Sequence, residues 1–225
     1  MTRSYKSTTQ SKIEAIGLIP LFYHDDLGTC TEVAKVIFDA GCPIVEFTNR
    51  GKGASAAFQR ILSIAGSDYP DAVVGIGSVH DPFTAAQYIS MGADFIVGPC
   101  FSEEVARLCN RHQILYVPGC ATPTEVIAAA ELGLDLIKIF PAGALGGADF
   151  IKAISGPFPW LKTIATGGVT ASKDDLAIWF GAKVAAVGLG SDLISKEVLT
   201  SKKYDTLATK ISELLETIAV LKAKI

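Results

Sequence analysis

One pattern repeats along almost the whole chain: short apolar runs alternate with longer segments whose apolar residues recur at helical spacing. This alternation predicts strand and helix units joined into a parallel sheet, because parallel strands need long crossover connections. Eight strands are expected, at Ile16 to Phe22, Pro43 to Phe47, Ala72 to Ile76, Phe95 to Val97, Ile114 to Val117, Leu136 to Ile139, Thr163 to Ala165 and Ala185 to Gly188.

The segments between these strands carry helix signals. Helices are expected over Thr29 to Ala40, Ala54 to Ala65, Pro82 to Met91, Ser102 to Arg111, Thr122 to Leu132, Ala148 to Ile154 and Ser172 to Phe180, followed by an amphipathic helix from Tyr204 to about Lys222. Glycines follow four of them, at Gly41, Gly92, Gly133 and Gly181. Glycine in this position predicts a left-handed turn that ends the helix.

Eight such units in 225 residues favour a (β/α)8 TIM barrel. We expect one domain over residues 1–225, with a short polar N-terminal segment and the amphipathic helix at the C-terminal end. An open, doubly wound sheet is the competing architecture. No Gly-x-Gly-x-x-Gly motif follows the first predicted strand, which disfavours dinucleotide binding.

Composition excludes several classes of protein. Apolar residues make up 49% of the chain and charged residues 19%, which disfavours disorder. A net charge of -3 without a basic cluster argues against nucleic acid as a partner. The polar stretch from Thr2 to Lys12 has no apolar signal region, and no apolar run approaches the roughly 20 residues of a membrane span. Five cysteines without a Cys-x-x-Cys pair predict reduced thiols in a cytoplasmic protein.

Lys138 stands inside the apolar run from Leu136 to Ile139. If that strand is buried, desolvation favours the uncharged amine, which is the form that attacks a carbonyl to give a Schiff base. The alternative is a lysine that reaches solvent or pairs with a carboxylate. Glu46 and Arg50 pose a similar choice. In the structural alternative, Glu46 forms an ion pair with Arg50 or with Lys138. In the catalytic alternative, Glu46 is a proton shuttle and Arg50 is the cation that binds a carboxylate substrate.

Glycine-rich turns follow the last two predicted strands, at Thr166-Gly167-Gly168 and at Gly188-Leu189-Gly190-Ser191. In TIM barrels the loops after strands seven and eight commonly bind phosphate through backbone N–H groups. The alternative is that glycine only relieves steric crowding where a strand turns into a helix, and this would be enough to explain one such turn. Two adjacent turns predict a phosphate site formed by Gly167, Gly168, Gly190 and Ser191.

Together these segments resemble the 2-keto-3-deoxy-6-phosphogluconate (KDPG) and 4-hydroxy-2-oxoglutarate (KHG) aldolase family, over about Ile16 to Ser191. The matching segments are Glu46 to Arg50, Gly75-Ile76-Gly77-Ser78-Val79, Gly98-Pro99, Pro118-Gly119, Ile137-Lys138-Ile139-Phe140-Pro141-Ala142, Gly156-Pro157-Phe158 and Thr166-Gly167-Gly168-Val169. The lysine segment and the Thr-Gly-Gly segment together are fairly specific to this family.

The resemblance implies a class I lyase that needs no metal or other cofactor. It implies that Lys138 forms a Schiff base with pyruvate and that Glu46 is the general acid and base. Arg50 and Ser78 would hold the pyruvyl carboxylate, with Thr166 nearby.

The same resemblance implies that Pro99 and Phe140 line the apolar side of the site and that the glycine turns bind a distal phosphate. The expected substrates are KDPG, cleaved to pyruvate and glyceraldehyde 3-phosphate, and 4-hydroxy-2-oxoglutarate, cleaved to pyruvate and glyoxylate. A homotrimer is expected by the same resemblance.

Two departures from the family pattern leave the aldehyde partner open. Gly143 stands where the family often has an acid, and Phe22-Tyr23-His24 stands where many members carry an arginine. Two other functions also stay open: a phosphosugar isomerase or epimerase, and a non-catalytic sensor of a phosphorylated ligand. Either would use the glycine turns without needing Lys138.

Overall fold

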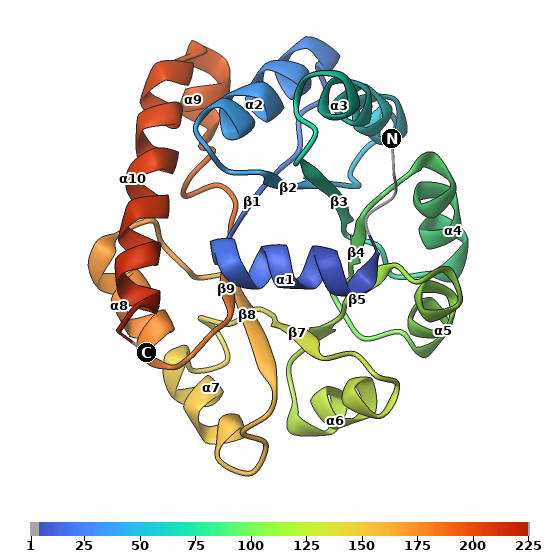
Figure 1. Ribbon diagram of the computed structural model, residues 1–225, viewed down its shortest axis with the longest axis vertical. Coiled ribbons are helices and arrows are strands. Elements are labelled where there is room, and N and C mark those ends of the chain that lie inside the picture. The colour runs from blue at the N-terminus through green and yellow to red at the C-terminus, as the bar shows by residue number, and fades with distance from the viewer. Residues whose placement is uncertain (1–4, 225) are drawn as a thin grey trace.

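A ring of parallel strands surrounded by helices forms the protein, in a computed structural model that describes residues 5–224 (Figure 1). The strands are β1 (Leu18–Phe22), β2 (Ile44–Thr48), β3 (Val73–Gly77), β4 (Phe95–Val97), β5 (Leu115–Val117), β6 (Gly119–Cys120), β7 (Leu136–Ile139), β8 (Lys162–Thr166) and β9 (Ala186–Leu189). The helices are α1 (Lys6–Ile16), α2 (Leu27–Asp39), α3 (Ala54–Asp68), α4 (Pro82–Met91), α5 (Glu103–His112), α6 (Pro123–Glu131), α7 (Ala148–Ser155), α8 (Lys173–Gly181), α9 (Lys196–Ser201) and α10 (Tyr204–Lys222). The predicted (β/α)8 barrel is confirmed.

Nine strands appear where eight were expected because the fifth is broken at Pro118. The strand order is β5-β4-β3-β2-β1-β9-β8-β7-β6, so its two ends are consecutive pieces of one strand. Proline has no N–H to donate to a ladder. The carbonyl of Pro118 still accepts the N–H of Lys138 at 2.9 Å, and that of Val117 accepts the N–H of Gly98 at 3.0 Å. The ring therefore closes around the break.

The strand register identifies which side chains point into the barrel, because paired residues in a parallel ladder share a face. On one side of the ring, Leu21 pairs with Glu46, Glu46 with Gly75 and Gly75 with Phe95. On the other side, Gly119 pairs with Lys138, Lys138 with Ile164 and Ile164 with Ala186. The two series are joined where β1 meets β9, because Ile19, two residues before Leu21, pairs with Gly188, two residues after Ala186. Glu46 and Lys138 thus belong to the same inward-facing set.

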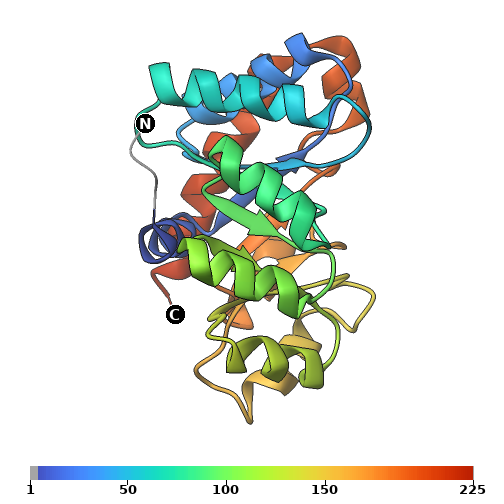
Figure 2. The ribbon, with the colours of Figure 1, turned by 90° about the vertical axis from the view of Figure 1, so that its right-hand side faces the viewer.

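An unpredicted helix, α1, begins in the polar N-terminal segment and continues to Ile16; the part of that segment before Tyr5 lies outside the described residues. Figure 1 shows α1 lying across one end of the ring, and Figure 2 shows it at the edge of the molecule. Its Ile13 is fully buried, and its Glu14 accepts Lys162 Nζ at 2.8 Å. Because Ile16 belongs to α1 and Gly17 ends it with φ 76°, the first strand starts at Leu18 rather than Ile16.

Three of the four predicted helix-ending glycines are confirmed in the left-handed region: Gly41, Gly92 and Gly133. The prediction for Gly181 was wrong, since α8 includes that residue and Lys183 takes the left-handed conformation, with φ 64°. The C-terminal amphipathic helix has the expected bounds, whereas the short helix α9 before it was not expected. Within residues 5–224, no helix is long and apolar enough to cross a membrane.

Candidate active site

Lys138 and Glu46 are both buried inside the barrel, with exposed fractions of 7% and 4%. Lys138 comes from the middle of β7 and Glu46 from the middle of β2. No salt bridge of 4 Å or less joins either of them to another described residue. Neither structural alternative considered from the sequence, a solvated lysine or a tight ion pair, is therefore present in residues 5–224.

The carboxyl group of Glu46 is desolvated. Burial raises its pKa above the usual range, and the positive charges of Lys138 and Arg50 oppose that effect only in part. The room for this carboxyl comes from Gly77 at the end of β3, where an added Cβ would overlap Glu46 Oε1. The acid therefore keeps its proton to a higher pH than an exposed glutamate, which suits a group that gives and takes protons.

Phe140 connects the lysine to the mouth of the barrel. Its ring centroid lies 4.8 Å from Lys138 Nζ. The same ring lies close to Gly167, where an added Cβ would come within 3.2 Å of a ring carbon. The Phe140 ring therefore lies next to both the amine of Lys138 and the Gly167 turn.

A cavity of about 390 Å³ opens at this end of the barrel. It is lined by Leu21, Phe22, Tyr23, Thr48, Arg50, Phe140, Thr166, Gly167, Gly168, Val169, Gly188, Gly190, Ser191, Asp192, Ile194, Lys196 and Leu199. Seven of the residues predicted for the site line it: Arg50, Phe140, Thr166, Gly167, Gly168, Gly190 and Ser191. Carboxyl ends of barrel strands are where TIM-barrel enzymes place their active sites.

Four predicted residues do not line this cavity. Lys138 and Glu46 lie in the barrel interior, and Lys138 reaches the cavity wall through Phe140. Ser78 and Pro99 follow β3 and β4 on the same rim. Ser78 has φ 62°, a left-handed conformation that a non-glycine residue adopts at a cost and that is often found at functional sites.

The turn after β8 explains why the chain has glycine at position 143. Gly167 and Gly168 are both left-handed, with φ 82° and 83°. The N–H of Gly143 donates to the carbonyl of Gly167 at 2.8 Å, and a Cβ at position 143 would come within 3.0 Å of Gly168 Cα. In this backbone arrangement a glutamate at position 143 would require the turn to shift. The close approach of the two turns therefore depends on having glycine, and not the acid of the family pattern, at position 143.

Sequence reasoning missed several residues that line the cavity, including Tyr23, Thr48, Asp192 and Lys196. Thr48 was within reach of prediction, since it lies two residues after Glu46 on one strand and therefore faces the same way. Lys196 belongs to α9, which the sequence pattern did not reveal. It adds a second cation to Arg50, and neither of the two has a carboxylate within 4 Å in the described part of the chain.

Comparison with known proteins agrees with this geometry. A family model described as "KDPG and KHG aldolase" matches residues 9–210. The chain belongs to the KDPG and KHG aldolase family. It is accordingly an aldolase, a lyase of carbon–carbon bonds.

Individual relatives cover most of the chain. A 2-dehydro-3-deoxy-phosphogluconate aldolase of Dickeya dadantii is 30% identical over 213 residues, which are 94% of this chain and 96% of the relative. A 2-dehydro-3-deoxy-6-phosphogalactonate aldolase of Escherichia coli is 35% identical over 82% of this chain and 86% of its own length. The crystal structure of KDPG aldolase from Legionella pneumophila, with pyruvate captured as a covalent carbinolamine, superposes with a TM-score of 0.84 at 27% identity, over 93% of this chain and 99% of that one.

Proposed function

We propose that this aldolase cleaves KDPG to pyruvate and glyceraldehyde 3-phosphate through a Schiff base on Lys138, with 4-hydroxy-2-oxoglutarate as a second substrate. One observation carries the proposal: a buried lysine, without a carboxylate partner within 4 Å among the described residues, lies against Phe140, which lines a cavity together with two glycine turns and two cations. A buried, unpaired amine is suited to covalent catalysis on a carbonyl carbon.

In the proposed reaction, the amine of Lys138 attacks C2 of the substrate and the carbinolamine loses water to give a protonated imine. Glu46 supplies the proton for that loss and then, as the carboxylate, removes the proton of the C4 hydroxyl. The bond between C3 and C4 breaks, so that C4 becomes the carbonyl carbon of the departing aldehyde, and the electrons of the bond pass to the imine to form an enamine. Protonation at C3 and hydrolysis release pyruvate. No step calls for a metal ion or another cofactor.

We assign the two ends of the cavity to the two anionic groups of the substrate. Arg50, with Ser78 and Thr166, would hold the pyruvyl carboxylate. Pro99 and Phe140 would line the apolar side of the site, next to the methylene group of the pyruvyl portion. Gly167, Gly168, Gly190 and Ser191 would bind the phosphate through backbone N–H groups, with Lys196 as the nearby cation. The cavity lining supports the assignment for all of these residues except Ser78 and Pro99, which are assigned from the family resemblance. The general affinity of such turns for anions supports the phosphate end.

The identity of the sugar acid is a separate choice. Relatives named for phosphogluconate and for phosphogalactonate both match this chain. We propose the phosphogluconate-derived acid, and rates with the two epimers of the phosphorylated acid would test that choice. Higher kcat/KM for the galactonate epimer would contradict it.

Borohydride trapping with pyruvate tests the mechanism directly. Intact mass and peptide mapping should show one pyruvyl adduct on Lys138, and Lys138→Ala should lose both the adduct and aldol cleavage. An isomerase or a ligand sensor would bind phosphorylated compounds without this adduct. A folded protein that gives no adduct would contradict the proposed function.

We also propose a homotrimer that works in the cytoplasm. The trimer rests on the family resemblance, and the location is supported by five cysteines that are all free thiols, as is usual in a reducing compartment. Sedimentation should give about three times the 23.7 kDa mass of the chain. A monomer at working concentration would contradict the trimer.

A further inference from the structure

The two glycine turns of the proposed phosphate site belong to different loops. Strands β8 and β9 are paired as far as Thr166 and Gly188; β8 ends there, and β9 ends one residue later at Leu189, which pairs with Pro20 of β1. The Gly167-Gly168 turn and the Gly190-Ser191 turn must face one phosphate group if both are to bind it. Contacts outside the sheet therefore have to set their relative position.

Asp192 makes such a contact. Its Oδ2 accepts the N–H of Ala171 at 2.5 Å, which joins the residue after Ser191 to the loop that follows Gly168. That loop is in turn fixed to α8, because Asp175 Oδ2 accepts the N–H of Thr170 at 2.6 Å. One carboxylate thus connects the two loops of the site.

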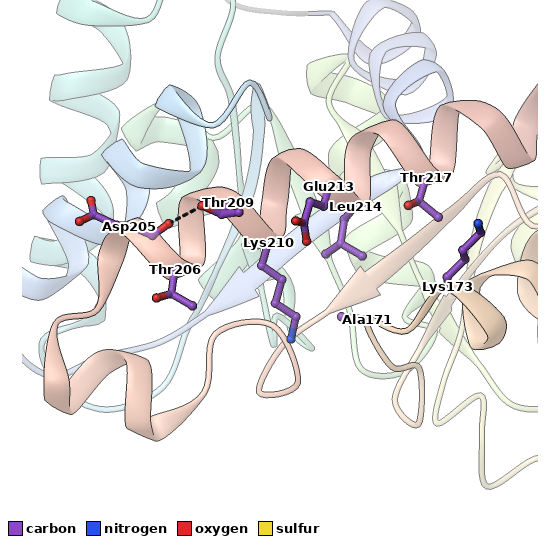
Figure 3. A pocket seen from close by; sticks show the side chains of 9 residues that line it. All are labelled: Ala171, Lys173, Asp205, Thr206, Thr209, Lys210, Glu213, Leu214 and Thr217. Carbon is purple, nitrogen blue, oxygen red and sulfur yellow. Dashed lines mark hydrogen bonds between the residues drawn. The ribbon is translucent and has the colours of Figure 1, made fainter.

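Lys210 forms a second hydrogen bond with Asp192, at the main chain. Its Nζ donates to the main-chain carbonyl of Asp192 at 2.8 Å. Lys210 belongs to α10, which is anchored by its buried Leu207, Ile211 and Leu214. Figure 3 shows Lys210 extending from α10 in a groove of about 720 Å³, which is also lined by Ala171 and by Lys173 at the start of α8. The 190–192 turn is therefore tied both to the neighbouring loop and to a packed helix.

Charge alone does not explain an aspartate here. Asp192 lines the cavity together with Gly168 and Ser191, and an ionised carboxylate repels a phosphate placed among them. Its hydrogen bond to Ala171 is the feature that offsets this repulsion. We infer that Asp192 and Lys210 are positioning residues, which hold the Gly190-Ser191 turn against the Gly167-Gly168 turn so that the enzyme selects phosphorylated over unphosphorylated 2-keto-3-deoxy acids. This inference rests on the proposed function.

Two substitutions at one position separate geometry from charge. Asp192→Ala removes both the acceptor and the charge, whereas Asp192→Asn removes the charge but keeps an oxygen that can accept from Ala171. Kinetics would be measured with KDPG and with 2-keto-3-deoxygluconate, which lacks the phosphate. For Asp192→Ala we expect kcat/KM with KDPG to fall about tenfold, because misplaced binding groups lose their effect on rate, while the value for the unphosphorylated acid stays within about twofold. Asp192→Asn should retain the wild-type preference or increase it.

Lys210→Met provides an independent test of the same tie, and Lys173→Met is its control. Both lysines line the groove in Figure 3, but only Lys210 donates to the 190–192 turn; Lys173 has no salt bridge in the described residues. Lys210→Met should lose preference for KDPG, and Lys173→Met should keep it. Pyruvate trapping on Lys138 should be unchanged in all four variants, because the pyruvyl end of the site is intact.

Three results would overturn the inference. The first is an unchanged preference for KDPG in Asp192→Ala and Lys210→Met. The second is an equal gain in both Asp192 variants, which would mean that the carboxylate only repels. The third is a parallel loss on both substrates, which would mean a general structural role. Failure of the proposed function itself is distinguishable, because the wild-type protein would then give no pyruvyl adduct.

Discussion

Glu46 occupies space that only glycine at position 77 leaves open. A methyl group there would overlap Glu46 Oε1 inside a packed barrel, where side chains have little freedom to move. We expect Gly77→Ala to displace the carboxyl and to lower kcat with KDPG by about 100-fold, the usual scale for losing a general acid or base. Pyruvate-coupled assays would measure this loss.

Gly181→Ala is the matched control for that substitution. No heavy atom lies within 4 Å of a Cβ added at Gly181, which is the last residue of α8. Alanine has the higher helix propensity, so stability should stay the same or rise by up to about 1 kcal/mol, with activity unchanged. Wild-type activity in Gly77→Ala would mean that the Glu46 carboxyl is not needed where it lies.

Glu46→Gln should separate activity from stability. Burial raises the pKa of Glu46, so above the pKa of the unfolded chain the folded protein binds a proton that the unfolded chain releases. Stability from this group is thus complete at low pH and is lost as pH rises through the folded-state pKa. A neutral glutamine has no such loss.

The Glu46→Gln variant should therefore match the wild-type melting temperature near about pH 4 and exceed it near about pH 8, where an unfolded glutamate is ionised. Its kcat should fall by about 100-fold or more. Melting temperatures across this pH range, with Glu32→Gln on the exposed face of α2 as the control, would measure the difference. A variant less stable than wild type at high pH would contradict the sign of the shift.

At the scale of residues, the site residues that could be predicted from the sequence are those whose charge stands out within an apolar run. Lys138 and Glu46 are charged residues within apolar strands, and both lie inside the barrel. The sequence did not predict Asp192 or Lys196, because the pattern around a charged residue in a polar segment does not indicate whether its side chain faces the cavity or the solvent. Their part in the cavity depends on how two loops approach each other, which is a property of the folded barrel.

At the scale of elements, α1 carries an unusual buried group. The Thr9 side chain is fully buried, and its Oγ1 has no hydrogen-bond partner among the described residues. Thr9→Val replaces that hydroxyl with a methyl group of similar size. We expect a gain of about 1 kcal/mol in the free energy of unfolding, since an unpaired buried hydroxyl costs at least that much.

Thr8→Val, at the exposed neighbouring position, is the control for this gain and should change stability by less than about 0.5 kcal/mol. Urea unfolding of both variants would measure the two effects. A destabilised Thr9→Val would mean that a water molecule satisfies the hydroxyl.

The same helix shows why elements differ in how predictable they are. Strands and outer helices repeat a period that the sequence displays, and all eight predicted strands and all eight predicted helices were found within a few residues of their bounds. Helix α1 buries only Thr9 and Ile13, so its apolar pattern is too sparse to recognise. Its position comes instead from contacts with distant residues, such as the N–H of Lys6 donating to Gln113 at 2.9 Å.

At the scale of the molecule, the reactivity of the cysteine thiols can be used to follow whether the barrel is folded. Burial raises the pKa of Cys30 to about 11 and that of Cys42, Cys109 and Cys120 to about 12. These four thiols come from different parts of the ring, whereas Cys100 is exposed after β4. Because the thiolate is the reactive form, the native protein should react quickly with a disulfide reagent at Cys100 alone. Cys100→Ser should remove this rapid reaction.

The urea dependence of the other four thiols tests whether the chain folds as one domain. If the barrel is a single cooperative unit, Cys30, Cys42, Cys109 and Cys120 become reactive together, at the urea concentration where circular dichroism is lost. Closure argues for this outcome, since opening the ring at any strand exposes the edges of its neighbours. Two thiols that react at lower urea than the other two would mean that half of the barrel unfolds first, and that the single domain predicted from the sequence is two folding units.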